Sequence, residues 1–384
     1  MAALALAASA DGYKFEKVWE LSTEALGIDK GNIRQGFGMN GKFYINDKSV
    51  PAIYEVDEHG LTGVTLAGGA NCGITRDQAG NIVVSDAAFP GSWIEAAIKV
   101  INPATGETKE YIVPEECGLL GRCDFLGFAK GNLMDSGVLY LTGKTPNTEI
   151  YTDGIAVLTI TDGEVDMDYC YLATCDGLGA AQRDNMTVIN FYTDLNGEDI
   201  ALYVYRSMSN YVKKMHYDGD NFTGENIALP GKGACNGTFA FVWDGNEFFV
   251  YPQTPNYQNA FAIALANAEE PLFTVASTIG TNPNSFQCNW LNAEVDENGV
   301  TIYQYAPGAN FAVYRLSKDM PQSLRGDVDM NGSIGISDAT ALIDYILMGD
   351  PEGIDLTAAD CDLDGFIGIG DVTALIDYIL SQSW

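Results

Sequence analysis

Hydrophobic and polar residues alternate in short runs along residues 11–320, and this period of two predicts β-strands. Turns that contain glycine lead into β-branched or aromatic runs at 40–47, 79–86, 135–143, 197–205, 244–251 and 297–305. A second run that ends in a turn follows each of these, at 52–60, 97–106, 154–163, 210–219, 259–270 and 310–319. A third run usually comes next, and a short strand with small residues precedes each unit. The pattern predicts six units of four strands.

Units of this kind, recurring every 40–60 residues, are typical of a β-propeller with six blades. The last unit lacks an outermost strand, because no further strand pattern follows Asp319. The segment 13–22 stands alone before the first unit and alternates like a strand at Phe15, Lys17 and Trp19. We therefore expect this N-terminal strand to complete the last blade and to remove its free edge. Two packed sheets of a β-sandwich are the alternative architecture.

The last sixty residues contain two near-copies of one acidic unit, at 327–347 and 360–380, offset by 33 residues. In both copies oxygen-bearing side chains occupy loop positions 1, 3, 5 and 12, and glycine occupies position 6. A hard cation needs six to eight oxygens at about 2.3–2.6 Å, and the position 7 carbonyl supplies a further ligand. The predicted ligands are Asp327, Asp329, Asn331, Ser333 and Asp338, then Asp360, Asp362, Asp364, Phe366 and Asp371. The pattern predicts two calcium ions; an acidic surface loop is the alternative.

Each loop is followed by the sequence TALIDYIL, whose apolar residues are spaced as on one face of a helix. A loop followed by a single helix, present twice, resembles a type I dockerin over residues 325–384. Such small calcium-folded modules dock secreted bacterial proteins onto partner domains, so the resemblance implies a cohesin-like partner. Position 12 is Asp, as in dockerins, where an EF-hand has Glu. Positions 10 and 11 are Ile336 and Ser337, then Ile369 and Gly370, rather than the hydroxyl pair often found in dockerins of cellulose-degrading assemblies.

The charge of the chain supports a cation-binding C-terminal region. No Lys or Arg follows Arg325, whereas twelve Asp and Glu do, so we expect metal binding to be coupled to folding. The whole chain has a net charge of −32, which argues against nucleic acid and against anionic membrane surfaces as partners. No run of eighteen apolar residues is present, so no membrane span is predicted.

The N-terminal segment 1–10 is apolar and ends in Ala8, Ser9 and Ala10, an A-x-A pattern typical of an export-signal cleavage site. It lacks a basic region before the apolar run, so a retained apolar segment is the alternative. The predicted organisation is therefore this segment, a propeller over 11–320 and a dockerin-like domain over 325–384. The A-x-A pattern and the calcium loops together predict an exported protein, extracellular or at the cell surface.

Five cysteines recur at the predicted starts of innermost strands, 51 to 60 residues apart: Cys72, Cys123, Cys175, Cys235 and Cys288. A soft metal bound in the channel is one interpretation. The other interpretation is that these cysteines are small buried side chains in crowded inner strands. This second interpretation is favoured because no histidine accompanies the cysteines. Cys117 with Cys123 and Cys170 with Cys175 are close enough in sequence to form disulfides, but sequence does not fix their geometry.

No catalytic motif is evident in the sequence. The two histidines, His59 and His216, are both expected in turns of outer strands, which argues against histidine-based chemistry. Carboxylates near inner strands could serve glycoside chemistry as a pair, although acidic residues are frequent throughout this chain. These are Asp77, Asp86, Asp124, Asp176 and Asp184, with Arg76 and Arg183 beside two of them. Loop aromatics such as Trp93 and Tyr257 could stack on sugar rings or simply pack.

The sequence thus predicts a secreted, non-catalytic scaffold or adhesion protein. Its calcium-dependent module would dock onto a cohesin-like domain or onto another copy of the chain, with assembly into filaments as one version. A propeller enzyme acting on glycans or lactones, and a protein that binds extracellular glycans, are the alternatives. The sequence does not identify the partner or the ligand.

Overall fold

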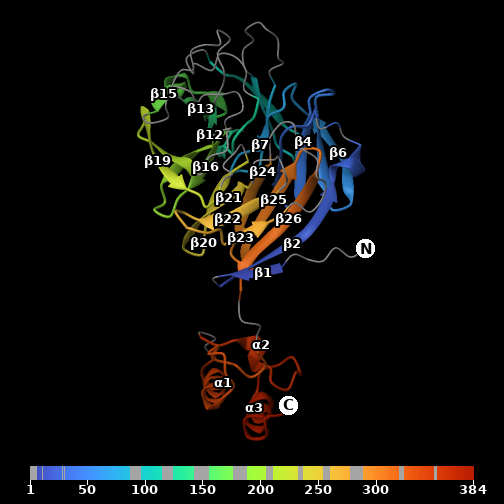
Figure 1. Cartoon of the computed structure of the whole chain (residues 1–384), viewed down its shortest axis with the longest axis vertical. Helices are drawn as coiled ribbons and strands as arrows, with labels where there is room; N and C mark the ends of the chain where they lie inside the picture. The colour runs from blue at the N-terminus through green and yellow to red at the C-terminus, as the bar shows by residue number, and fades with distance from the viewer. Residues whose placement is uncertain are drawn as a thin grey trace. The chain divides into compact units, whose positions relative to one another are not determined.

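The computed structural model describes residues 7–10, 12–27, 29, 31–86, 97–114, 124–141, 155–175, 188–204, 211–231, 237–253, 260–276, 289–319, 324–349 and 353–384. The chain divides into two compact units, Met1–Ser317 and Lys318–Trp384, which are described in turn. The first unit consists of strands and the second of short helices (Figure 1).

Six antiparallel meanders make up the first unit, as the spacing of strand patterns predicts. Blade one contains β3 (Gly36–Met39), β4 (Lys42–Asp47), β5 (Ala52–Asp57) and β6 (Gly60–Ala67). Blade two contains β7 (Ile74–Arg76), β8 (Ile82–Ser85), β9 (Ala97–Ile101) and β10 (Thr108–Ile112). Blade three contains β11 (Lys130–Asn132), β12 (Ser136–Leu141), β13 (Ile155–Thr161) and β15 (Tyr171–Cys175). A two-residue strand, β14 (Glu164–Val165), and the 3₁₀ turn Met167–Tyr169 lie between β13 and β15.

The remaining blades follow the same order from the inside of the ring outward. Blade four contains β16 (Val188–Thr193), β17 (Asp199–Val204), β18 (Tyr211–Tyr217) and β19 (Asn221–Ala228). Blade five contains β20 (Phe239–Trp243), β21 (Asn246–Pro252), β22 (Phe261–Leu265) and β23 (Phe273–Val275). Blade six contains β24 (Trp290–Asp296), β25 (Gly299–Ala306) and β26 (Asn310–Lys318). The six-bladed propeller is therefore confirmed, and the β-sandwich alternative is wrong.

The N-terminal strand closes the ring as expected. Strand β2 (Tyr13–Ser22) pairs with β26 and supplies the outer strand that blade six lacks in sequence order. A short strand, β1 (Ala7–Ala10), adds a fifth strand to this blade by pairing antiparallel with β2. The A-x-A segment of the sequence thus lies in a strand of blade six. A 3₁₀ turn, Thr23–Leu26, then leads into blade one.

One feature of the sheets does not follow from the repeat pattern. The outer strands β15 and β19 of blades three and four pair in parallel, with Thr174 opposite Asn221 and Cys175 opposite Phe222. The two blades are thereby joined into one nine-stranded sheet. Because parallel pairing between consecutive meanders satisfies edge groups of both strands, it removes two free sheet edges at once.

Aromatic side chains fill the spaces between blades. Phe15 on β2 stacks on Tyr314 of the same blade and on Phe273 of blade five, with ring centroids 5.3 Å apart in both pairs. All three side chains are buried in a cluster that spans blades five and six. Offset aromatic pairs add about 0.5–1.5 kcal/mol to the burial of their surface, so β2 is held by packing as well as by its ladder.

A closed ring of hydrogen bonds joins the innermost strands. The inner edge of each blade would otherwise expose unpaired backbone groups to a narrow channel, where they cost free energy unless they are satisfied. Each blade instead bonds its neighbour, either backbone to backbone or through a side-chain amide. The six contacts are Gln35 with Ile74, Arg76 with Ala129, Phe128 with Phe191, Asn190 with Thr238, Gly237 with Leu291, and Asn292 with Gly38.

Glycines allow the inner strands to approach this closely. A Cβ atom at Gly127 would lie 1.8 Å from the carbonyl oxygen of Ile189, and one at Gly237 would lie 1.6 Å from that of Asn289. Both distances are far below van der Waals contact, so neither position accepts a side chain without movement of the adjacent blade.

The second unit contains α1 (Ile336–Met348), α2 (Leu356–Ala359) and α3 (Ile369–Ser381). Its core brings α1 and α3 together through Leu342 and Leu375, which are both fully buried. Cys361 belongs to the same core, and burial raises the pKa of its thiol to about 12. The thiol therefore stays neutral and packs as a small apolar group.

Ring closure can be tested on β2 itself. Replacing Phe15 with Ala removes a side chain that is 1% exposed, and such truncations cost about 3–5 kcal/mol of unfolding free energy. Val18 lies on the same strand but is 58% exposed, so Val18→Ala is the matched control and should change stability little. Thermal unfolding followed by circular dichroism measures both. Equal melting temperatures for the two variants would contradict the closing role of β2.

Candidate metal centres

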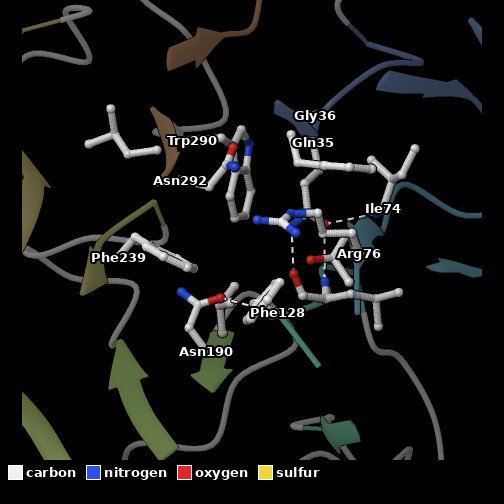
Figure 2. Close-up of a pocket in the computed structure, with 14 residues that line it drawn as sticks. Gln35, Gly36, Ile74, Arg76, Phe128, Asn190, Phe239, Trp290 and Asn292 are labelled. Carbon is white, nitrogen blue, oxygen red and sulfur yellow. Dashed lines mark hydrogen bonds between the residues drawn. The ribbon is translucent and has the colours of Figure 1, made fainter. Parts of the chain in front are cut away.

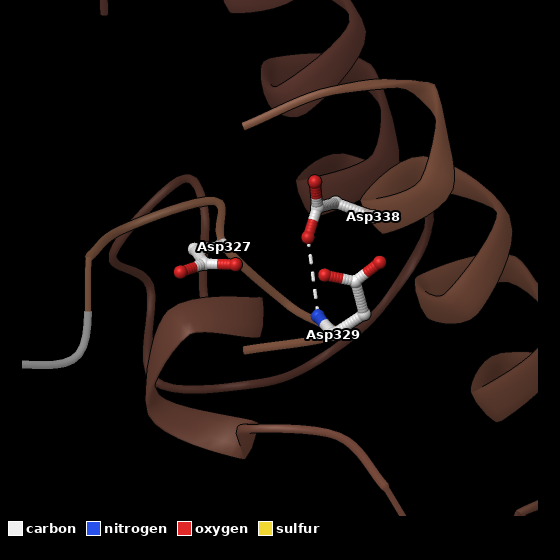
Figure 3. Close-up of side chains that lie close together, drawn as sticks. All are labelled: Asp327, Asp329 and Asp338. Carbon is white, nitrogen blue, oxygen red and sulfur yellow. Dashed lines mark hydrogen bonds between the residues drawn. The ribbon is translucent and has the colours of Figure 1, made fainter. Parts of the chain in front are cut away.

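Three carboxylates converge in the first acidic loop. Asp327, Asp329 and Asp338 each place an oxygen within 4.8 Å of the oxygens of the other two (Figure 3). Asp338 is the third residue of α1, and its two oxygens accept from the backbone N–H groups of Asp329, at 3.1 Å, and Gly335, at 2.8 Å. The carboxylate thus caps the helix and fixes the loop around it at the same time.

The second loop repeats this arrangement. Asp360, Asp362 and Asp364 form the group of close carboxylates. Asp371 is the third residue of α3, as Asp338 is of α1, and it accepts from the N–H groups of Asp362, at 3.1 Å, and Gly368, at 2.7 Å. Desolvation raises the pKa of the Asp362 carboxyl, and the neighbouring carboxylates raise it further. A cation bound among these carboxylates would offset the repulsion between their like charges.

One oxygen in each loop has no partner. Asp327 Oδ1 and Asp360 Oδ1 are buried and accept no hydrogen bond from the described residues, although both occupy loop position 1. The second oxygens of these carboxylates are used, because they accept from Gly332 N–H at 2.9 Å and Gly365 N–H at 3.1 Å. A buried carboxylate oxygen without a donor is costly, and a bound cation would satisfy it. The donor set fits calcium on this ground, since it consists of hard oxygens.

The remaining predicted ligands shape the loops. Asn331 Oδ1 accepts from the backbone N–H and hydroxyl of Ser333, and Asp364 Oδ1 accepts from Phe366 N–H at 2.8 Å. These short-range bonds place the side chains of position 5 and the backbone of position 7 in one turn. All ten residues that the sequence singles out therefore lie in two equivalent loops of the structure.

The turn at each loop requires left-handed backbone conformations. Gly332 and Gly365 at position 6 have φ angles of 84° and 88°, as the sharp turn predicts. Position 4 is also left-handed, at Met330 and Leu363, with φ angles of 58° and 63°. The sequence gives no sign of the second turn, because neither Met nor Leu favours this conformation.

Apolar side chains are exposed beside both loops. Ile336 and Ile369, at loop position 10, are 77% and 76% exposed, so they are not part of the core. Residues seven and eleven positions further along each helix are exposed as well: Ile343 and Leu347 on α1, Ile376 and Leu380 on α3. This spacing places three apolar residues on one face of each helix. The two faces are equivalent by the sequence repeat.

Two of the carboxylates that the sequence places near inner strands, Asp77 and Asp86, have structural partners. Asp77 is fully buried and accepts from the backbone and side chain of Asn81 and from Leu133 N–H. Asp86 pairs with Lys99 at 3.0 Å. Asp124 is buried, whereas Asp176, Asp184 and Arg183 lie outside the described residues.

Neither histidine lies on an inner strand. His59 is exposed in the turn between β5 and β6, as expected. The placement of His216 in a turn is wrong, because this residue lies within β18, where its Nδ1 is 3.1 Å from a carboxylate oxygen of Glu198. The strand simply extends further toward the turn than its mixed polar sequence suggests.

Only part of the cysteine pattern can be located. Cys72 is fully buried in an apolar cluster, and burial raises the pKa of its thiol, which favours packing over metal binding at this position. Cys117, Cys123, Cys235, Cys288 and the Cys175 side chain lie outside the described residues, as do Trp93 and Tyr257.

A pocket that the sequence does not predict lies on the propeller axis. Residues from or next to the innermost strands of all six blades line it (Figure 2). Arg76 of β7 contributes the charged group, and burial lowers the pKa of its guanidinium. The sequence offers only a weak signal for this site, because a single arginine in a strand pattern is most often on a solvated face.

Among the described residues, no helix has the length and apolar character needed to cross a bilayer.

Similarity to known structures is distant. The chain resembles a streptogramin B lyase structure at 12% identity, over 81% of this chain and 92% of that chain, with a TM-score of 0.39. It also resembles a protein of unknown function from Bacteroides caccae at 12% identity, over 71% and 81%, with a TM-score of 0.36. A subtype N10 neuraminidase-like protein of A/little yellow-shouldered bat/Guatemala gives 9% identity, over 82% and 94%, with a TM-score of 0.43. Similarities at this level carry no functional argument.

The C-terminal unit is identified by its sequence family. A comparison with curated proteins finds no match to the chain. Residues 325–380 match the family model of the dockerin type I domain, which covers both acidic loops and their helices. Dockerin domains bind calcium and mediate docking between proteins. The chain therefore carries a type I dockerin domain at residues 325–380, following an N-terminal region with a six-bladed β-propeller arrangement.

Proposed function

We propose that this protein is exported and that its dockerin domain binds two calcium ions, one in each loop, to attach the propeller to a cohesin-type domain. The observation that carries the proposal is a pair of buried carboxylate oxygens, at Asp327 and Asp360, that have no partner among the described residues. Two equivalent loops with the same orphaned atom call for two cations of the same kind. In this proposal the propeller is the delivered domain and performs no catalysis itself.

The charge of the domain supports calcium-dependent folding. Residues 326–384 contain twelve acidic and no basic side chains, and the loop carboxylates lie within 4.8 Å of one another. Without cations, repulsion between these groups opposes the loop geometry that places Asp338 and Asp371 at their helix starts. Part of the free energy of ion binding therefore drives the folding of the domain.

The exposed helix faces support docking. The face formed by Ile336, Ile343 and Leu347 and the face formed by Ile369, Ile376 and Leu380 leave large apolar side chains in water. Grouped apolar residues on a small domain are typical of an interaction site. Ile336 and Ile369 also lie next to the calcium loops, so loss of the ion would disturb the surface that a partner contacts.

We expect calcium removal to unfold the helices of this domain. Titration calorimetry of the full chain should give two calcium ions, and Asp327→Ala or Asp360→Ala should each reduce the number to one. Asp344→Ala is the matched control, because Asp344 is an exposed carboxylate of α1 outside the loop and its loss changes the charge equally. A helical circular dichroism signal that is unchanged by EDTA would contradict the proposal, as would two ions bound to Asp360→Ala.

We expect charged residues at loop position 10 to abolish docking without loss of calcium. The double variant Ile336→Asp, Ile369→Asp places charges on exposed positions and should still bind two ions, while binding to type I cohesin domains falls at least about a hundredfold. Val50→Asp with Leu195→Asp adds the same charge at exposed propeller positions and should bind as the parent does.

The measurements are cohesin binding by surface plasmon resonance and mass in solution by analytical ultracentrifugation, both with calcium. One outcome is a parent that binds no cohesin but forms oligomers with calcium that the isoleucine double variant does not form. In that case the partner is a second copy of the chain and not a cohesin-type domain. Turnover of a polysaccharide or lactone by the parent would overturn the non-catalytic role of the propeller.

A further inference from the structure

The pocket on the propeller axis combines a cation with surplus hydrogen-bond donors. A small cavity of about 30 Å³, continuous with open solvent, lies between the innermost strands. Because every blade contributes to its lining, the pocket exists only in the closed ring.

Arg76 places a guanidinium group among these residues. Its side chain is 13% exposed, and its Nε–H is buried without an acceptor in the described part of the chain. One terminal nitrogen lies 3.4 Å from the carbonyl oxygen of Ala293 and 3.8 Å from a carboxylate oxygen of Glu294. Guanidinium groups have five N–H donors, so within the described part of the chain these two long contacts leave most of the donors unused.

Glu294 does not neutralise Arg76 by a close ion pair. The other oxygen of this carboxylate, Oε2, accepts from the Tyr303 hydroxyl at 2.6 Å and from Asn40 N–H at 2.8 Å. These bonds hold Glu294 toward blade one, at 3.8 Å from the guanidinium, which is longer than a bidentate pair allows. Arg76 therefore keeps a side that can accept a further anion.

The amides of the pocket are also short of acceptors. Gln35, Asn190 and Asn292 come from three different blades, and the oxygen of each accepts a backbone N–H of a neighbouring blade. Each amide nitrogen donates to one carbonyl oxygen, that of Leu126, Thr238 or Gly38 respectively. An amide nitrogen carries two hydrogens. Within the described residues, the second N–H of each amide therefore has no acceptor, while the amide oxygen already accepts a hydrogen bond.

The remaining walls are apolar and aromatic. Phe128, Phe239 and Trp290 line the pocket, and the Arg76 guanidinium carbon lies 4.8 Å from the centre of the Phe128 ring. Such walls do not suit a hydrated inorganic anion such as phosphate, whose oxygens all need donors. They suit a ligand with one anionic end and an apolar body.

We propose that the axial pocket binds a small organic carboxylate, with its carboxylate on Arg76 and the free amide hydrogens and its apolar part against the aromatic rings. The bound carboxylate would supply the acceptor that the buried Nε–H lacks. Arginine suits this role because its planar fork matches the two oxygens of a carboxylate. This site concerns the propeller alone and does not depend on calcium or on docking.

The probes are acetate and benzoate, with acetamide and benzamide as neutral molecules of matched shape and chloride as the control for ionic strength. Binding to the full chain is measured by the change in tryptophan fluorescence, since Trp290 lines the pocket, and by isothermal titration calorimetry. We expect benzoate to bind more tightly than acetate, and both more tightly than their amides. Arg76→Gln should weaken benzoate binding at least about tenfold, because a charge-assisted hydrogen bond is lost.

Arg76→Lys is the second variant, in case Arg76→Gln does not fold. It keeps the positive charge but not the planar pair of N–H donors. It should therefore weaken benzoate binding measurably, but less than Arg76→Gln does. The Asp327→Ala variant should bind benzoate as the parent does, which separates this site from calcium binding. Equal affinity for benzoate and benzamide, or an affinity unchanged in both Arg76 variants, would overturn the proposal. Tighter binding of inorganic phosphate than of benzoate would overturn the ligand class.

Discussion

The closed ring of hydrogen bonds between the innermost strands is the interaction on which the propeller depends. Each inner strand has one edge that no strand of its own blade covers, and buried backbone groups at such an edge cost free energy unless they are satisfied. Direct backbone bonds satisfy some of these groups, as between Phe128 and Phe191. Amides such as Asn190 and Asn292 bridge the wider gaps, because their oxygen and nitrogen satisfy one backbone group each. The size of the axial pocket follows from this ring.

The ring also explains the irregular features of the sheets. A closed arrangement brings the last blade beside the first, and β2 supplies the strand that links the two ends of the propeller chain. Glycine at positions such as Gly127 and Gly237 is required because the inner strands come closer than a Cβ atom allows. At the outside of the ring, the parallel pairing of β15 with β19 likewise satisfies backbone groups at two sheet edges.

The dockerin domain satisfies its buried polar groups in a different way. Its hydrophobic core is small, and no described residue donates a hydrogen bond to Asp327 Oδ1 or Asp360 Oδ1. A domain of this size gains little stability from burial alone, so a metal ion has a large effect on whether it folds. The propeller instead pairs the buried charge of Lys214, which lies between Asp194 and Glu247 at 2.7 and 3.2 Å. In the proposed function, attachment through the dockerin would respond to calcium while the propeller stays folded.

The sequence by itself determined the number of blades, the closing strand and the presence of the two acidic loops. Alternation, glycine turns and ligand spacing are local properties, and an exact repeat of 33 residues leaves little freedom in their interpretation. It did not determine the left-handed turns at Met330 and Leu363, since tertiary and loop constraints override the preference of these residues. Nor did it determine the axial pocket, because Arg76, Gln35, Asn190 and Asn292 come from four blades and meet only when the ring closes. Contacts between residues more than a hundred positions apart carry no local pattern, and so only the tertiary structure decided them.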